Sequence, residues 1–214
     1  MSRIAVIGGH GKVALQLTRL LAEEGHQVSS FFRNPAHIDD VVETGAEPVV
    51  ADFEELDTAA IADLLKGHHG VVWTAGAGGG DPARTYAVDQ DAAIRTIDAA
   101  EIDGIKRFVM VSYYGAGRQH GVAPDDSFYA YAEAKAAADE HLRSSSLEWT
   151  VLGPSRLTLD PPTGLIETGP GVVKGAVGRA DVAAVVAQVL HQPSTHYRTI
   201  EFNNGATPIA DAIG

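Results

Sequence analysis

The chain of 214 residues contains no cysteine, which excludes disulfides, thiol nucleophiles and cysteine-based metal sites. It has no apolar run near the roughly 18 residues that a membrane-crossing helix needs. It also has no basic start leading into an apolar stretch and a small-residue cleavage site. We therefore expect a cytoplasmic protein that does not associate with a membrane.

Basic residues are scarce as well. Sixteen Lys and Arg stand against 28 Asp and Glu, which gives a net charge of −12. This charge repels a nucleic-acid backbone, so we expect no nucleic-acid partner and instead a small-molecule substrate. The composition does not indicate which oligomeric state the protein has.

Several catalytic motifs are missing too. The sequence has no Gly-x-Ser-x-Gly nucleophile elbow, no NTPase phosphate loop and no His-Glu-x-x-His pair. Its nine histidines are scattered along the chain, and we predict no metal site from their spacing.

What the sequence does contain is an alternation of short apolar runs with helical periodicity, which is typical of βαβ units and a parallel sheet. The segment 154–178 is rich in Pro and Gly and is predicted to be a long loop, and Asp181 is predicted to cap the helix that follows. Strands are predicted at 3–7, 28–32, 48–51, 70–75, 107–112, from 149, and 198–202, and helices at 13–21, 85–100, 128–142 and 181–190.

A glycine turn, Gly8-Gly9-His10-Gly11-Lys12-Val13-Ala14, lies between the first strand and the first helix. Glycines there allow a tight turn and close approach of a pyrophosphate, and the helix N-terminus offers free amides and partial positive charge. The turn therefore predicts a dinucleotide site, and a turn that only reverses the chain is the alternative.

The second strand ends in Phe31-Phe32-Arg33, without the carboxylate that would bind the ribose hydroxyls of NAD. Arg33 offers a charged donor fork suited to a 2′-phosphate, so NADP(H) is preferred over NAD(H); a solvated surface arginine is the alternative. Asp52 and Phe53 end the third strand and are expected to meet the adenine, although Asp52 could equally cap the next helix.

Tyr131 and Lys135 lie four residues apart on one face of a predicted helix. A lysine cation near a tyrosine stabilises the phenolate, so the pair could exchange protons near neutral pH. The alternative is an aromatic residue packed on the sheet beside a solvated lysine.

These features, taken in order along the chain, resemble the atypical short-chain dehydrogenases/reductases of the NmrA-like, NAD(P)H-binding group, which includes flavin and biliverdin reductases. The resemblance also rests on the segments 107–112, 149–154 and 178–183. It implies an α/β, Rossmann-like, doubly wound and mainly parallel sheet in a single NAD(P)-binding domain, 1–214, with small substrate-side elements in 77–84, 114–127 and 155–177.

The resemblance also implies roles for individual residues. It places a catalytic group of Ser112, Tyr131 and Lys135 at the nicotinamide, and it assigns the cofactor contacts to Gly8, His10, Gly11, Lys12, Val13, Arg33, Asp52, Phe53, Ala75, Gly76, Tyr131, Lys135 and Pro154.

Two positions depart from the pattern of the group. Tyr113 stands where related chains often have a second serine, and Gly153 stands where the sixth strand commonly ends in Arg-Pro. The expected function is an NADP-dependent oxidoreductase that moves hydride between NADP(H) and a small organic acceptor. A non-catalytic NADP(H)-binding redox sensor is the alternative, and a nucleotide-sugar epimerase or dehydratase is the third reading.

Overall fold

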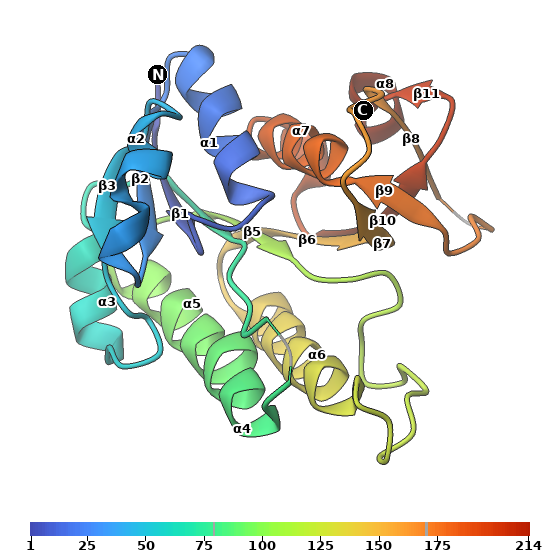
Figure 1. Cartoon of the computed structure of the whole chain (residues 1–214), viewed down its shortest axis with the longest axis horizontal. Helices are drawn as coiled ribbons and strands as arrows, with labels where there is room; N and C mark the ends of the chain where they lie inside the picture. Colours follow the sequence, from blue (N-terminus) through green and yellow to red (C-terminus); the bar gives the residue numbers. More distant parts are fainter. Residues whose placement is uncertain (79, 170) are drawn as a thin grey trace.

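The computed structural model of the protein describes residues 1–78, 80–169 and 171–214. Residues 79 and 170 fall within the expected substrate-side segments 77–84 and 155–177 and lie outside the described residues. The chain forms one large mainly parallel sheet with helices on both faces (Figure 1). In the described part of the chain, no helix is both long and apolar enough to cross a bilayer.

The large sheet has the order β11-β8-β10-β6-β5-β4-β1-β2-β3. From β3 to β10 the strands run parallel, whereas β8 is antiparallel to both β10 and β11. Its strands are β1 (Arg3–Ile7), β2 (Gln27–Phe32), β3 (Glu47–Val50), β4 (Gly70–Trp73), β5 (Arg107–Val111), β6 (Glu148–Pro154), β8 (Leu165–Thr168), β10 (Arg198–Asn204) and β11 (Thr207–Pro208).

The helices divide between the two faces of the sheet. α1 and α7 pack together over one face, and α3, α5 and α6 cover the other (Figure 1). Their bounds are α1 (Ala14–Glu23), α2 (Ile38–Val42), α3 (Thr58–Leu65), α4 (Pro82–Thr85), α5 (Ala93–Ile102), α6 (Tyr129–Ser144), α7 (Arg179–Leu190) and α8 (Ile209–Ile213), with 3₁₀ turns at Pro35–His37 and Pro193–Thr195.

The two cores follow from the alternation of side chains along each strand. In β1, Ile4 and Val6 join the core under α1 and α7, while Ala5 and Ile7 join the core over α3 and α5. Both faces of the central strands are apolar for this reason, which is typical of a parallel sheet covered by helices on each side. The predicted fold class is confirmed.

Both edge strands of the large sheet contain a proline, Pro48 in β3 and Pro208 in β11. The Ala51 amide donates to the Phe32 carbonyl of β2. Amides alternate in direction along a strand, so the position of Pro48 faces away from β2.

The prediction of a long loop over 154–178 is wrong. Three short strands lie there: β7 (Arg156–Thr158), β8 and β9 (Ala176–Gly178), of which β7 and β9 form a separate two-stranded parallel sheet. Asp181 does not cap α7, because the helix begins at Arg179. Its buried carboxylate instead accepts the Thr163 and Gly164 amides and so fixes the turn before β8.

The helix predicted over 85–100 is present but irregular. It starts as α4, continues as a π-helical segment at Tyr86–Ala92 and ends as α5. π-helical turns inside α-helices often accompany functional sites, and this one carries the buried residue Asp89.

Candidate functional site

A pocket of about 410 Å³ opens at the carboxyl ends of β1, β2 and β4. The connections leaving β1 and β4 go to opposite halves of the sheet, which makes this the point where the strand order reverses. Open α/β sheets bind their ligands at such switch points. The residues that line the pocket and were expected to bind a cofactor are Gly8, His10, Gly11, Arg33, Asp52, Phe53, Ala75 and Gly76.

The glycine turn is tightly fitted between β2 and β4. Gly8 has φ +85°, and a Cβ added there would lie 2.6 Å from the Ala75 backbone. A Cβ at Gly9 would lie 1.9 Å from the Ser30 hydroxyl oxygen. Only glycine fits at these two positions, and the turn can therefore pass directly over the ends of the strands.

Lys12 and Val13 lie behind the pocket rather than in its lining: Lys12 is exposed and the Val13 side chain is in the core. Their contribution is through the backbone. Within the described residues, the amides of His10, Lys12 and Val13 donate to no protein acceptor. Three free amides at the start of α1, together with the partial positive charge of its N-terminus, make a site for a diphosphate.

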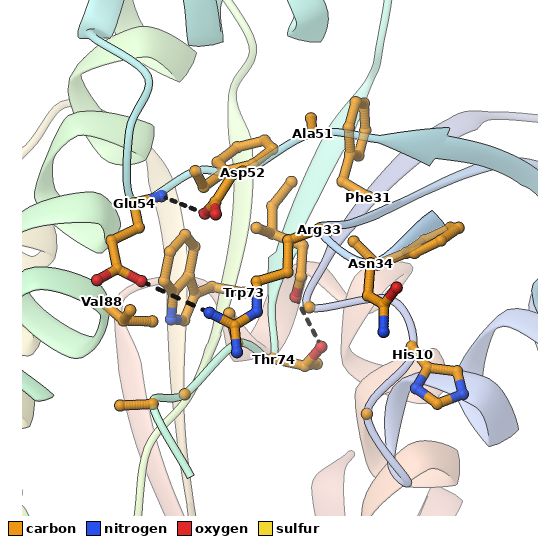
Figure 2. Close-up of a pocket in the computed structure, with 18 of the residues that line it drawn as sticks. His10, Phe31, Arg33, Asn34, Ala51, Asp52, Glu54, Trp73, Thr74 and Val88 are labelled. Carbon is orange, nitrogen blue, oxygen red and sulfur yellow. Dashed lines mark hydrogen bonds and ion pairs between the residues drawn. The ribbon is translucent and has the colours of Figure 1, made fainter. Parts of the chain in front are cut away.

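Two arginines face this pocket, and one carboxylate contacts both. Glu54 Oε2 lies 3.3 Å from Arg84 Nε and 3.9 Å from Arg33 Nη1. Arg84 is also fixed by donating to the Ala77 carbonyl. Figure 2 shows the Arg33 side chain extending across the pocket toward Glu54. Arg33 is the more exposed of the two arginines, and within the described residues this long ion pair is its one side-chain partner.

Asp52 does not cap α3, since Asp57 does. The Asp52 carboxylate instead accepts the Glu54 amide at 3.1 Å and shapes the loop after β3 (Figure 2). Arg95 on α5 donates to the carbonyls of Phe53 and Glu54 and so fixes the same loop to α5. This wall of the pocket is thus preformed.

The three expected catalytic residues lie at the ends of β5 and on α6, outside the lining of the pocket. Ser112 Oγ donates to Asp139 Oδ2 at 2.6 Å, and both residues are buried. Lys135 is 1 % exposed, and its ammonium donates to the Val111 carbonyl at 2.9 Å. Pro154 is buried at the end of β6, where its carbonyl accepts the Tyr114 amide.

Asp89 connects this group to the pocket. Its carboxylate accepts the Ala77 amide at 2.9 Å, directly beneath the Gly76 that lines the pocket. Burial raises the pKa values of Asp89 and Asp139, and the Lys135 cation opposes the rise in both. The charge of Lys135 therefore favours the ionised form of both buried carboxyl groups.

Tyr131 packs with Tyr113 and Phe128 in an aromatic group, with ring centroids 5.1 to 5.6 Å apart. Burial raises the pKa of Tyr131 above that of an ordinary tyrosine, and the Asp89 and Asp139 charges raise it further. The direction is opposite to the lowering expected from Lys135, because burial of the phenol outweighs it; the Lys135 ammonium donates to the Val111 carbonyl. Burial likewise raises the pKa of Tyr113 to about 12.

The two departures from the pattern of the group have local explanations. A Cβ at Gly153 would lie 3.0 Å from Glu201 Cγ and 3.1 Å from the Tyr113 carbonyl oxygen, so a larger side chain would displace the β5 end. Tyr113 turns its ring into the aromatic group, and its buried hydroxyl has no partner among the described residues.

Several residues of this region were missed by the sequence reasoning. Arg84 and Asp89 lie on the irregular helix and have no motif to mark them, although Arg84 falls in the expected segment 77–84. The other missed lining residues are Ile7, Phe31, Phe32, Asn34, His37, Ala51, Glu54, Trp73, Thr74, Ala77 and Val88.

The chain matches the family model described as NAD(P)H-binding over residues 8–193. Among curated proteins it is 32 % identical to the uncharacterized sugar epimerase YhfK of Bacillus subtilis, with 99 % of this chain and 98 % of that protein covered. It is also 32 % identical to the UPF0659 protein YMR090W of Saccharomyces cerevisiae, with 99 % and 97 % covered.

Among solved structures, a candidate NAD-dependent epimerase/dehydratase from Bacillus halodurans superposes with a TM-score of 0.91 at 34 % identity, covering 100 % of this chain and 99 % of that one. The oxidoreductase ylbE from Lactococcus lactis superposes with a TM-score of 0.88 at 25 % identity, covering 99 % and 94 %. The ChuY anaerobillin reductase of Escherichia coli O157:H7, at 22 % identity and a TM-score of 0.78 over 95 % and 97 % of the chains, shares the fold.

Proposed function

Since this chain belongs to the NAD(P)H-binding family, we propose that it is an NADP-dependent oxidoreductase of the short-chain dehydrogenase/reductase type acting on a small organic acceptor. The observation that supports this most directly is the glycine turn. Its three free amides and its two obligatory glycines stand at the switch point of the sheet, with Arg33 on the same pocket wall.

The residues present fit a phosphorylated dinucleotide. The amides of the glycine turn would hold the diphosphate, and Asp52 with the loop after β3 would border the adenine. Arg33 would leave its long contact with Glu54 and bind the 2′-phosphate through its planar donor fork. When bound, the cofactor would supply or accept the hydride.

The proton would come from the chain itself. Ser112 would orient the acceptor, its hydroxyl held by Asp139, while Lys135 balances the buried carboxyl charge. Tyr131 would be the proton donor, since its phenol carries its proton at neutral pH as that of an ordinary tyrosine does, and burial raises its pKa further.

Replacement of Tyr131 tests the enzymatic role. Tyr131→Phe removes only the hydroxyl, and we expect NADPH oxidation with the best acceptor from a panel of quinones, aldehydes and flavins to slow by about 10²-fold or more. The rate is followed by NADPH absorbance, with Tyr129→Phe on the same helix as the control. If the wild-type protein shows no turnover above background across the panel, it is not this kind of enzyme.

Replacement of Arg33 tests the cofactor preference. Arg33→Ala should weaken NADP(H) binding by about 2 kcal/mol, or roughly 30-fold, and leave NAD(H) binding nearly unchanged, because only NADP carries the 2′-phosphate. Calorimetry on both cofactors measures the difference, and Arg19→Ala, an exposed arginine on α1 outside the pocket, is the control. Equal losses for the two cofactors would show that Arg33 does not bind the 2′-phosphate.

The names of the Bacillus subtilis and Bacillus halodurans relatives favour a second candidate, an epimerase or dehydratase that regenerates its own nicotinamide. Such an enzyme would convert a nucleotide sugar without net NADPH consumption, whereas the proposed reductase consumes one NADPH per turnover. Product analysis with nucleotide sugars separates the two.

The Tyr113 hydroxyl is buried beside Tyr131 without a hydrogen-bond partner in the described part of the chain, which favours the non-catalytic redox sensor. A sensor would bind NADPH and NADP⁺ with different affinities and would be unaffected by Tyr131→Phe.

A further inference from the structure

Beside the glycine turn, the fold brings together His10, His37 and Asp40, here called the imidazole–carboxylate cluster. His10 comes from the turn itself, His37 ends a 3₁₀ turn after β2, and Asp40 lies in the first turn of α2. Their ligating atoms all lie within 4.8 Å of one another. Both histidines line the cofactor pocket, and Figure 2 shows His10 at its edge.

The spacing of these atoms suits a tetrahedral metal ion. Ligand bonds of about 2.0 to 2.1 Å at tetrahedral angles place neighbouring ligand atoms about 3.3 Å apart. Asp40 Oδ2 lies 2.8 Å from His10 Nε2 and 3.9 Å from His37 Nδ1, on either side of this value. A small movement of the Asp40 carboxylate away from His10 and toward His37 would make these two distances equal.

Binding also requires a rotation of the two rings, and it would loosen the 3.2 Å contact of His37 Nε2 with Asn34 Nδ2. They are stacked with centroids 3.5 Å apart and planes 5° from parallel. The two side chains are about one third exposed, and rotation of an imidazole about its Cβ–Cγ bond has a broad energy profile. Turning both rings toward Asp40 would aim one nitrogen of each at a shared point.

A second group of two histidines and one carboxylate allows a comparison with the imidazole–carboxylate cluster. Glu24, His26 and His191 also approach one another in the described part of the chain. There the rings are 4.6 Å apart, the contact between His26 and Glu24 is 3.8 Å, and His26 Nδ1 already accepts the Ser2 amide. This group lacks the close carboxylate contact of the first and is a matched comparison for it.

We propose that His10, His37 and Asp40 bind a zinc-class divalent ion at the edge of the pocket. Two imidazoles and one carboxylate are ligands suited to Zn²⁺, and three protein ligands leave a fourth position open. Because both imidazoles line the pocket, the open position faces the ligand space and takes a phosphate oxygen. This last step rests on the proposed binding of NADP(H), whereas the ion site does not.

Zinc calorimetry on the full chain, with any polyhistidine tag removed, tests the site. We expect one Zn²⁺ per chain, and Asp40→Asn and His37→Gln should each weaken binding by at least about tenfold. The affinity for Zn²⁺ should also decrease as the pH is lowered, because the ligands must lose their protons to bind the ion. The control is the double variant His26→Gln/His191→Gln, which should keep the site, and thermal melting confirms that every variant is folded.

The proposed site is wrong if the folded variants Asp40→Asn and His37→Gln bind Zn²⁺ as tightly as the wild type. It is also wrong if the control double variant no longer binds Zn²⁺. Titration of NADPH with and without Zn²⁺ tests the open position: zinc should tighten NADPH binding in the wild type and have no effect in Asp40→Asn. An NADPH affinity independent of zinc would overturn that step. Absence of NADPH binding under both conditions would refute the proposed function while leaving the ion site standing.

Discussion

Glu54 is the pocket carboxylate that contacts the arginines, and its charge opposes anion binding there. Its carboxylate contacts both Arg84 and Arg33, so a 2′-phosphate must compete with it for Arg33. Arg84 is held by a second contact to Ala77, and Arg33 is not. The strength of this competition sets how much of the Arg33 charge is available to the cofactor.

Neutralising this carboxylate should increase NADP(H) affinity. In Glu54→Gln, Arg33 loses this carboxylate partner, and we expect NADP(H) to bind about two- to fivefold more tightly, a gain of roughly 0.4 to 1 kcal/mol typical of an exposed ion pair. NAD(H) affinity should be unchanged. Calorimetry compares the two cofactors, and Glu55→Gln, an exposed neighbour with the same change in net charge, is the control. A similar gain in the control would assign the effect to net charge alone.

At the scale of elements, Lys135 interacts with three segments that pack beside the pocket: α6, the end of β5 and the π-helical segment. It lies on α6, donates to the end of β5, and balances Asp139 on its own helix and Asp89 on the π-helical segment. Asp89 in turn holds the Ala77 amide in the loop after β4. A cation placed here keeps two carboxyl groups buried and the loop in position.

Removing this cation should destabilise the fold. Lys135→Met keeps most of the side-chain volume but leaves two buried carboxyl groups unbalanced, at a cost of about 3 to 5 kcal/mol near neutral pH. Asp139→Asn removes one of those carboxyl groups and should be much milder. Urea unfolding measures both, with the exposed Lys106→Met as the control.

The pH dependence of this destabilisation has a definite sign. The pKa values of Asp89 and Asp139 are raised in the folded state. These groups therefore contribute most to the stability of the fold at pH values below the pKa of an Asp in the unfolded chain. This contribution is lost as the pH rises through their pKa values in the folded protein. The deficit of Lys135→Met should therefore shrink as pH falls toward 4, where the carboxyl groups take up protons. A deficit independent of pH would show that packing, not charge, is what Lys135 supplies.

At the scale of the whole molecule, the sequence predicted what local patterns encode. The order of strands and helices follows from apolar periodicity, and the pocket residues at strand ends follow from parallel strands ending at one edge of the sheet. The glycine turn was recognisable because its residues are consecutive. These signals were enough to predict the fold and eight of the residues that line the pocket.

Features that depend on distant residues were not predictable in the same way. His37 and Asp40 reach His10 only because β2 and the glycine turn leave the sheet side by side. Spacing on α6 could place Lys135 one turn from both Tyr131 and Asp139, but only the packing of the π-helical segment brings Asp89 near the lysine as well. The strands β7, β8 and β9 are three or four residues long within a Pro- and Gly-rich stretch, too short for a clear period.

The prolines at the two borders of the large sheet, Pro48 and Pro208, have a consequence for how copies of this protein meet. A newcomer strand aligning with either border would find a missing donor, and on the β3 side that gap faces outward. Ladder extension from one molecule to the next, the route to fibrous aggregates, is thereby interrupted at both ends. Association of copies through the borders of the large sheet is therefore disfavoured.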